Sequence, residues 1–316
     1  MRAALLRNMG DDALEVRDDI ELVDVGPGEV KVKIEATGVC HSDLSCMNGT
    51  IPQPAPAVLG HEGAGVVAEV GEGVTDVQVG DHVIIAWSPP CGECAFCGPR
   101  HQPNLCSNIQ MVMGGTPHFR LDGTPVFGMA GAGTFAEEMI IPHQGVVKID
   151  KDIPLEIGSL VGCGVMTGVG AAINTAKVTP GSSVIVYGCG GVGISCIQGA
   201  KVAGASVIVA VDLNDGKLED AKRFGATHAC KPDEVDALKA SLTGGDGFDY
   251  AFEAIGLPTT MRASYDAIRR GGTACIVGVG KLDLDGMITR RIKLDEINDA
   301  FAAMQRGEVI RQVISF

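Results

Sequence analysis

Short segments in which apolar and polar residues alternate fill the first half of the chain. Three of them are Glu29–Glu35, Gly65–Val70 and Asp81–Ala86, and glycines separate many of these segments. Alternation with a period of two predicts strands that bury one face, and many short strands joined by turns are typical of a small barrel. We therefore predict an all-β domain over residues 1–164.

From residue 165 to residue 280 the pattern changes to strands that alternate with helices. The predicted strands are Ser183–Gly188, Ser206–Asp212, His228–Lys231, Asp249–Ala254 and Thr273–Val279, and the predicted helices include Ile194–Val202, Lys217–Phe224 and Thr259–Ile268. This order implies right-handed βαβ units and a parallel sheet, so the second domain is expected to be α/β. Later in the chain, apolar residues spaced three and four apart predict an amphipathic helix over Leu294–Arg306.

The overall composition excludes several classes of protein. A length of 316 residues suits two domains, and 46% hydrophobic with 20% charged residues is typical of a globular chain. The net charge of −14 repels nucleic acids and anionic membranes, so neither is expected as a partner. We find no apolar run of the roughly 18 residues that a membrane span needs and no signal-peptide core, and we predict a cytoplasmic protein.

Four of the 11 cysteines lie close together in the sequence. Cys91, Cys94, Cys97 and Cys106 have the spacing C-x2-C-x2-C-x8-C. In a cytosolic chain such a group indicates metal binding before disulfides, and four thiolates suit tetrahedral zinc with no position left for water. The alternatives are chance clustering and an iron–sulfur cluster, but ferredoxin-type runs continue with a closer fourth cysteine followed by proline. We predict a structural zinc lobe over residues 91–106.

A second set of possible metal ligands is dispersed along the chain. It comprises Cys40, His61 and Cys163, with the acidic residues Asp43 and Glu62 nearby in sequence. Two cysteines and one histidine would leave the fourth position of a zinc ion open, as catalysis requires, and a neighbouring carboxylate could orient the imidazole. Spacing alone does not link these residues, and each of them taken alone is better explained as a buried core cysteine or a hydrogen-bonded histidine.

A glycine-rich turn follows the first strand of the predicted parallel sheet. It comprises Gly188, Gly190, Gly191, Val192 and Gly193, and Asp212 closes the next strand 19 residues later. In this context glycines let a pyrophosphate approach a helix N-terminus, and the carboxylate accepts the adenosine ribose hydroxyls while repelling a 2′-phosphate. The pattern predicts NAD binding in preference to NADP; the alternative is a tight turn without a ligand.

Taken together, these motifs resemble the zinc-dependent medium-chain alcohol dehydrogenase family over nearly the whole chain. The matching segments are Gly38–Asp43, Gly60–Gly65, the four-cysteine lobe, Gly162–Thr167 and Gly188–Gly193. The resemblance implies an α/β protein that joins a GroES-like β-barrel catalytic domain to a Rossmann-type, doubly wound parallel sheet. It also implies that residues 281–316 return to the catalytic domain.

The resemblance further assigns roles to individual residues. Cys40, His61 and Cys163 would bind a catalytic zinc, Asp43 and Glu62 would support it, and Ser42 would share a hydrogen bond with the substrate oxygen. Near the cofactor, Thr167 and Val192 would pack against the nicotinamide, and positive charge would come from His41, Lys217 and Arg311. Trp87, the only tryptophan, would form an aromatic wall of the substrate pocket, unless it is an ordinary core residue.

The implied reaction is the oxidation of a primary or aromatic alcohol by NAD to the aldehyde and NADH, with zinc as the Lewis acid. We expect two zinc ions per chain, NAD, and a small alcohol or aldehyde as substrate. The alternatives are a dehydrogenase for a thiol adduct of formaldehyde or for a polyol and, in another class, a non-catalytic zinc and dinucleotide binding protein. Ile51 and Gln110 stand where the glutathione-dependent branch needs an acid and an arginine, which disfavours that activity.

The junction of Gly280 and Lys281 departs from the family pattern. A doubly wound sheet normally has a sixth strand, and too few residues remain here for its crossover. The family has several tens of residues at this point, including the strand through which two cofactor domains pair. We hypothesise that the sequence omits a segment here and that the intact protein is a homo-oligomer, either a dimer or a tetramer.

Overall fold

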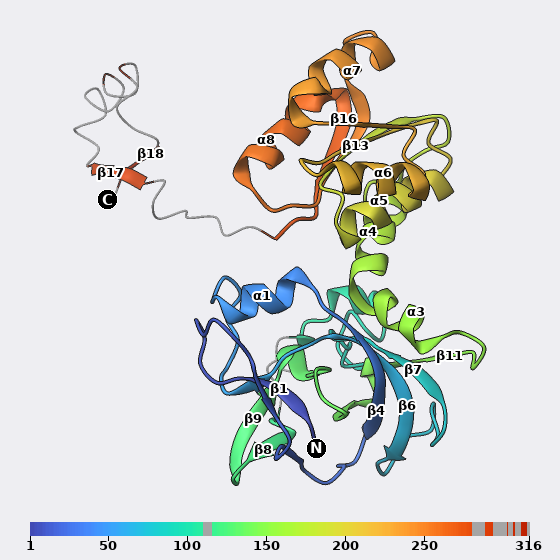
Figure 1. The fold of residues 1–316 in the computed structure, drawn as a ribbon, viewed down its shortest axis with the longest axis vertical. Coiled ribbons are helices and arrows are strands. Elements are labelled where there is room, and N and C mark those ends of the chain that lie inside the picture. Colours follow the sequence, from blue (N-terminus) through green and yellow to red (C-terminus); the bar gives the residue numbers. More distant parts are fainter. Residues whose placement is uncertain (110–115, 280–287, 293–301, 303–305, 307–310, 315–316) are drawn as a thin grey trace.

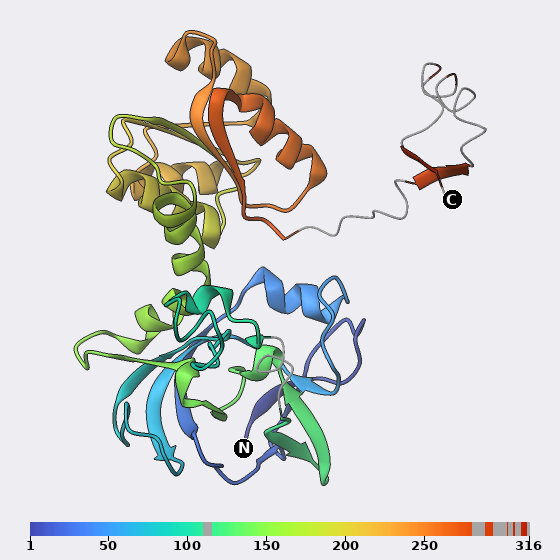
Figure 2. The same ribbon diagram turned by 180° about the vertical axis from the view of Figure 1, so that it is seen from behind.

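The computed structural model describes the whole chain except residues 110–115, 280–287, 293–301, 303–305, 307–310 and 315–316. The described part contains a β-rich domain, an α/β domain and a helical segment that joins them (Figures 1 and 2). This arrangement confirms the predicted α/β fold class with a barrel-like first domain.

The first domain is built from two sheets. The six-stranded sheet has the order β2-β1-β5-β9-β8-β3, and the five-stranded sheet has the order β10-β4-β6-β7-β11. The strands are β1 (Ala3–Leu6), β2 (Glu15–Arg17), β3 (Glu21–Leu22), β4 (Glu29–Gly38), β5 (Ala57–Val58), β6 (Glu62–Val70), β7 (His82–Ile85), β8 (Phe119–Leu121), β9 (Thr124–Gly128), β10 (Glu138–Pro142) and β11 (Val146–Ile149). Helix α1 (His41–Met47) follows β4, and the short 3₁₀ turns η1 (Pro103–Leu105), η2 (Met129–Gly131) and η3 (His143–Gly145) complete the domain.

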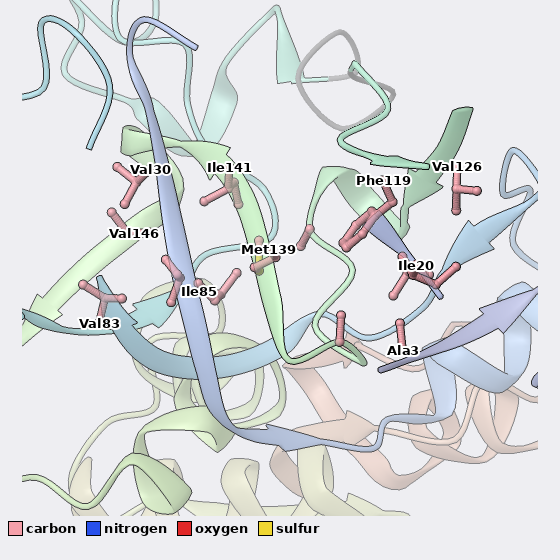
Figure 3. Close-up of a cluster of buried hydrophobic side chains, with 14 of the residues drawn as sticks. Ala3, Ile20, Val30, Val83, Ile85, Phe119, Val126, Met139, Ile141 and Val146 are labelled. Atoms are coloured by element: carbon pink, nitrogen blue, oxygen red, sulfur yellow. The ribbon is translucent and has the colours of Figure 1, made fainter. Parts of the chain in front are cut away.

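The alternating pattern of β4 explains how these sheets enclose a core. Val30 and Val32 are fully buried, whereas the intervening Lys31 forms an ion pair of 2.7 Å with Glu69 at the surface. Side chains from both sheets meet in one cluster (Figure 3) that includes Phe119 and Met139, each fully buried. Removing this apolar surface from water is the main force that holds the two sheets together.

A single long helical segment joins the domains. It runs through α3 (Leu155–Leu160), the π-turn η4 (Val161–Val165), α4 (Met166–Gly170) and the π-turn η5 (Ala171–Thr175). By length and composition alone, its 21 residues could cross a membrane, and 39% of its most apolar stretch is buried inside the protein. However, Gly162 packs on the carbonyl of Ile85 in the first domain, and Gly168 packs on that of Val192 in the second. We therefore interpret it as a core helix shared by the two domains; the predicted boundary between residues 164 and 165 falls inside it.

The second domain is a five-stranded parallel sheet of order β14-β13-β12-β15-β16 with helices on both faces. In chain order its elements are β12 (Ser183–Tyr187), α5 (Gly191–Val202), β13 (Val207–Val211), α6 (Asp215–Phe224), β14 (His228–Cys230), η6 (Pro232–Glu234), α7 (Val235–Thr243), β15 (Phe248–Glu253), α8 (Pro258–Ala267) and β16 (Ile268–Ile276). All five strands predicted from the sequence are present.

The last of these strands differs from its predicted bounds of 273–279. β16 begins at Ile268, which pairs with Phe248 before the ladder shifts register, so the glycines that precede the predicted start at Thr273 lie within the strand. It ends at Ile276, and the next two N–H groups, those of Val277 and Gly278, both donate to the carbonyl of Glu253.

Near the C-terminus, β17 (Ile288–Ile292) and β18 (Arg311–Ile314) pair as a two-stranded parallel sheet. Most of the predicted helix Leu294–Arg306 and the junction of Gly280 with Lys281 lie outside the described residues. The return of residues 281–316 to the first domain therefore stays a prediction.

Candidate functional site

The four cysteines of the predicted lobe converge on one point. The sulfur atoms of Cys91, Cys94, Cys97 and Cys106 all lie within 4.8 Å of one another, and those of Cys94 and Cys97 are 3.5 Å apart. Four Zn–S bonds of about 2.3 Å in a tetrahedron would place sulfurs about 3.8 Å apart, so the cluster is the right size for zinc.

Backbone N–H groups in this lobe point at sulfur. The N–H of Cys91 donates to Cys106 Sγ over 3.3 Å, and the N–H of Cys94 donates to Cys91 Sγ over 3.4 Å. The N–H donor of Cys97 is the largest cause that lowers the pKa of Cys94, to about 5, and that of Cys91 lowers the pKa of Cys106. A loop that favours thiolates is suited to a dipositive metal, because metal ligation requires the deprotonated form.

The dispersed set also converges. Cys40 precedes α1, His61 precedes β6, and Cys163 lies in the π-turn η4 of the joining helix. Ligand atoms of these three residues and of Glu62 lie within 4.8 Å of one another. The fold thus brings together residues that are up to 123 positions apart in sequence, which the spacing could not show. The two thiols and one imidazole fit three positions of a zinc ion.

A buried carboxylate fixes two members of this set. Asp43 is 3% exposed; its Oδ2 accepts a 2.8 Å hydrogen bond from the N–H of Cys40, and its Oδ1 lies 3.1 Å from His61 Nδ1. When Nδ1 is the protonated nitrogen, Nε2 is free for a metal. Burial disfavours the protonated ring, but the Asp43 carboxylate and the Cys40 thiolate outweigh this effect and raise the pKa of His61 to about 9.

Glu62 occupies a different place from Asp43. Its Oε1 accepts a 3.3 Å hydrogen bond from the N–H of Gly164, next to the candidate ligand Cys163, and a Glu62 oxygen lies within 4.8 Å of the ligand atoms of Cys40, His61 and Cys163. Burial raises the pKa of Glu62. Of the two carboxylates that the sequence suggested as supports for the histidine, only Asp43 is bonded to it.

The two remaining groups predicted at this centre also lie beside it. Ser42 Oγ is 3.6 Å from Cys40 Sγ, and the rings of Trp87 and His61 are 6.0 Å apart between centroids, edge to face at 85°. The indole Nε1 of Trp87 is buried and has no hydrogen-bond partner among the described residues. Trp87 thus lies against the candidate metal ligand His61, where it would limit the space for a substrate.

Thr134 is a positioning residue that the sequence analysis missed. It is fully buried, and its hydroxyl lies 2.8 Å from that of Thr37. A Cβ on Gly60 would come within 2.6 Å of the Thr134 hydroxyl, so Thr134 and the glycine at φ 91° together define the turn that presents His61. No motif marks this threonine, because its role depends on a contact across 74 residues.

The glycine-rich turn has the geometry of a phosphate cradle. Gly188 has φ 92°, and a Cβ on Gly193 would collide with the carbonyl of Gly188, so both positions require glycine. Gly190 and Gly191 are exposed, and a Cβ built on either would meet nothing within 4 Å. Open space at the N-terminus of the 12-residue helix α5 fits a pyrophosphate.

Asp212 lies at the end of β13, as predicted, beside the glycine-rich turn. Its Oδ2 accepts a 2.9 Å hydrogen bond from the N–H of Cys189, and its Oδ1 accepts one of 2.9 Å from the N–H of Asn214. Thr167 and Val277 line a cavity of about 430 Å³ between α4 and the end of β16. Half-buried Val192 lies in α5, and exposed Lys217 in α6.

Two of the predicted cationic residues are less well defined. His41 is exposed at the start of α1, and Arg311 lies in β18, where only the backbone is described. Their proposed contribution to cofactor binding stays a prediction.

Comparison with known proteins gives matches over both domains. Residues 26–151 match the family "Alcohol dehydrogenase GroES-like domain" and residues 191–316 match "Zinc-binding dehydrogenase". Alcohol dehydrogenase class-3 of Cereibacter sphaeroides is 38% identical over 370 aligned residues, which cover 96% of this chain and 98% of that protein. S-(hydroxymethyl)glutathione dehydrogenase of Paracoccus denitrificans is 37% identical, with 96% of this chain and 98% of that protein covered.

Solved structures are also similar. An alcohol dehydrogenase zinc-binding domain protein from Burkholderia ambifaria has a TM-score of 0.83 at 31% identity and covers 100% of this chain and 98% of its own. Benzyl alcohol dehydrogenase from Acinetobacter calcoaceticus has a TM-score of 0.80 at 30% identity, with 99% and 98% covered.

The alignment with the Cereibacter protein is longer than the chain itself. It runs over 370 positions, 54 more than the 316 residues of this chain. At least that many positions therefore have no counterpart here. This agrees with the hypothesis that a segment is missing, although the predicted junction lies outside the described residues.

Proposed function

The chain belongs to the zinc-dependent medium-chain alcohol dehydrogenase family, and from this premise we propose that it transfers a hydride between a primary or aromatic alcohol and NAD. The observation that carries the proposal is the joining helix. It places the zinc ligand Cys163 in η4 and, four residues later, Thr167 in α4, where the next residue, Gly168, packs on the carbonyl of Val192 in the glycine-rich turn. A metal centre and a nicotinamide site thus adjoin, as hydride transfer requires.

Residues of the chain have distinct tasks in this reaction. Bound zinc would supply a Lewis acid at the alcohol oxygen, and the nicotinamide would accept the hydride. Cys40, His61 and Cys163 would hold the zinc. Asp43 contacts His61 Nδ1, which would leave Nε2 of the ring to bind the zinc. Ser42 Oγ, beside Cys40 Sγ, would share a hydrogen bond with the substrate oxygen, and it could relay the alcohol's proton by passing its own hydroxyl proton on to solvent.

The preference for NAD over NADP rests on Asp212. Its carboxylate is held by two backbone N–H groups next to the glycine-rich turn, so it is in place to accept ribose hydroxyls. A 2′-phosphate there would meet a fixed negative charge. Among the structural relatives is a zinc-binding dehydrogenase solved with NADP, at 26% identity, so the family fold itself does not decide the cofactor.

The second candidate substrate is the glutathione adduct of formaldehyde, because relatives 37–39% identical carry that name. Against it stands Ile51, which packs on the apolar cluster around Leu6 and Leu59 where an acidic residue would be needed. Gln110 lies outside the described residues. We therefore place an uncharged alcohol first, and Trp87 beside His61 favours an aromatic one.

A substrate comparison with purified protein tests the proposal. NADH absorbance would be followed with benzyl alcohol, a short aliphatic alcohol, a polyol, and formaldehyde mixed with glutathione, each with NAD and NADP. The highest kcat/KM is expected for benzyl alcohol with NAD. A higher value for the glutathione adduct would instead support the second candidate. Absence of turnover with every substrate, at full zinc content, would indicate the non-catalytic alternative.

We also propose that the protein is cytoplasmic and forms a homo-oligomer. The bacterial dehydrogenases named among its relatives support a shared general function, and size-exclusion chromatography with light scattering measures the oligomeric state directly.

A further inference from the structure

The carboxylate of Glu253 is fully buried at the end of β15 and is only half satisfied. Its Oε1 accepts hydrogen bonds from the N–H groups of Ile255 (3.0 Å) and Gly256 (2.8 Å) and from the hydroxyl of Thr260 (2.6 Å). Its Oε2 has no partner among the described residues. Three donors on one oxygen suit an ionised carboxylate, which can only accept.

The space next to Glu253 Oε2 is so small that only a glycine fits at position 278. A Cβ on Gly278 would lie 2.6 Å from this oxygen. The main chain of Glu253 is held as well, because its carbonyl accepts the N–H groups of Val277 (2.8 Å) and Gly278 (2.9 Å). An acidic side chain is therefore fixed between the ends of β15 and β16, and no cation is paired with it in the described part of the chain.

The sheet order places this charge under one half of the dinucleotide site. Asp212 directly follows β13, which lies on one side of β12, and would bind the adenosine ribose. The remainder of the dinucleotide must then cross the end of β12 toward β15 and β16, because such ligands lie across the carboxyl ends of the strands. Glu253 is paired with Tyr187, the last residue of β12, on the neighbouring strand about 4.8 Å away.

Two further contacts connect Glu253 to the nicotinamide side. Ile255, whose N–H it holds, lies against Gly188, where a Cβ would come within 2.6 Å of Ile255 Cγ1. Val277, whose N–H it also holds, lines the cavity that contains Thr167. The buried charge therefore lies behind the wall against which the nicotinamide would rest.

The nicotinamide ring carries a positive charge in NAD⁺ and none in NADH, whereas the pyrophosphate is the same in both. We propose that Glu253 uses its unpaired negative charge to favour the oxidised cofactor over the reduced one, which makes it a positioning residue that sets the affinity ratio of NAD⁺ to NADH. This inference rests on the proposed function, because it requires that the turn binds NAD. Screening through the protein limits the expected effect to about fivefold in that ratio.

The test compares the Kd of NAD⁺ and of NADH, measured by calorimetry, in matched variants. In E253Q and in E253L, two neutral replacements, the ratio Kd(NAD⁺)/Kd(NADH) is expected to rise about fivefold. E253D keeps the charge and should keep the ratio. D249N is the control for charge loss on the same strand: Asp249 lies near its other end and contacts Arg269 over 2.7 Å, so its ratio should not change.

The outcomes separate this inference from the proposed function. Equal losses of affinity for both cofactor forms, or an unchanged ratio in the neutral variants, would show that Glu253 only anchors the loop and would overturn the inference. Wild-type protein that binds neither form would overturn the proposed function and the inference together. Zinc content and thermal unfolding of each variant show whether the fold is retained, and either neutral variant that folds is sufficient.

Discussion

Asp212 Oδ2 accepts a 2.9 Å hydrogen bond from the backbone N–H of Cys189, the second residue of the glycine-rich turn. The group that would recognise the adenosine ribose is therefore also a brace for the turn that would hold the pyrophosphate. Cofactor selectivity and the shape of the phosphate cradle are coupled through this one carboxylate.

The first prediction follows from this coupling. Asp212→Ala should raise KM for NAD by about 10- to 100-fold, because hydrogen bonds to a charged group are lost both to the ribose and to the turn. The preference for NAD over NADP should decrease as the negative charge disappears. Steady-state kinetics with both cofactors measure this, and Asp215→Asn, which removes a nearby exposed charge paired with Lys231, is the control. An unchanged ratio of NAD to NADP efficiency would refute the role of Asp212.

The second prediction concerns metal content. Wild-type protein should contain two zinc ions per chain, since two separate clusters have ligand atoms within 4.8 Å. The Cys163→Ala variant should lose the catalytic zinc and its enzymatic turnover but still bind NAD. The Cys97→Ala variant should lose the zinc of the four-cysteine lobe. Elemental analysis and cofactor titration provide the readouts, with the buried, non-ligand Cys196→Ala as control. Iron in the lobe, or full activity with a single zinc, would contradict the assignment.

Removing the charge of Asp43 provides the third prediction. Asp43→Asn should lower the affinity of the catalytic site for zinc by about 10- to 100-fold, as expected when a residue that orients a ligating histidine is lost. The zinc of the four-cysteine lobe should not be affected. Competition with a chromophoric chelator resolves the two classes of site. Equal retention of both zinc ions in the variant and the wild type would mean that the 3.1 Å contact with His61 does not contribute to metal binding.

The fourth prediction is a pattern of thiol reactivity. Burial raises the pKa of Cys46 and Cys230 to about 11 and that of Cys189 and Cys196 to about 12. A thiol reacts as thiolate, so at pH 8, well below these values, these four should resist iodoacetamide in the folded protein. After chelation of the metal, Cys94 should be the first cysteine to react with iodoacetamide, because its pKa is lowered to about 5. Mass spectrometry after labelling measures the order, and rapid labelling of Cys196 in the folded protein would contradict it.

Local sequence pattern was sufficient for much of the fold and for the four-cysteine cluster of ligands. Short apolar runs in the sequence predict the parallel strands. The four-cysteine lobe lies within 16 residues, so the convergence of its sulfur atoms is nearly a local property. The set of Cys40, His61 and Cys163 needed the family resemblance, because only the tertiary fold brings these residues together.

The residues that pattern did not identify act through long-range contacts. Thr134 shapes the turn before His61 from another part of the chain, and Glu253 is the last residue of a buried strand in which an acidic side chain has no local explanation. The start of β16 was placed too late for a related reason: consecutive glycines indicate a turn in isolation, but the neighbouring strand β15 pairs on both sides of them.

The joining helix has a consequence for how the protein moves. Cys163, in the π-turn η4, and Thr167, in α4, lie four positions apart on one unbroken helical segment. We expect a movement of one domain against the other to bend the chain outside this segment, for example in the non-helical residues 176–182, and not between these two residues. The two domains can then move apart to exchange the cofactor while the distance between the candidate metal ligand Cys163 and Thr167 stays constant.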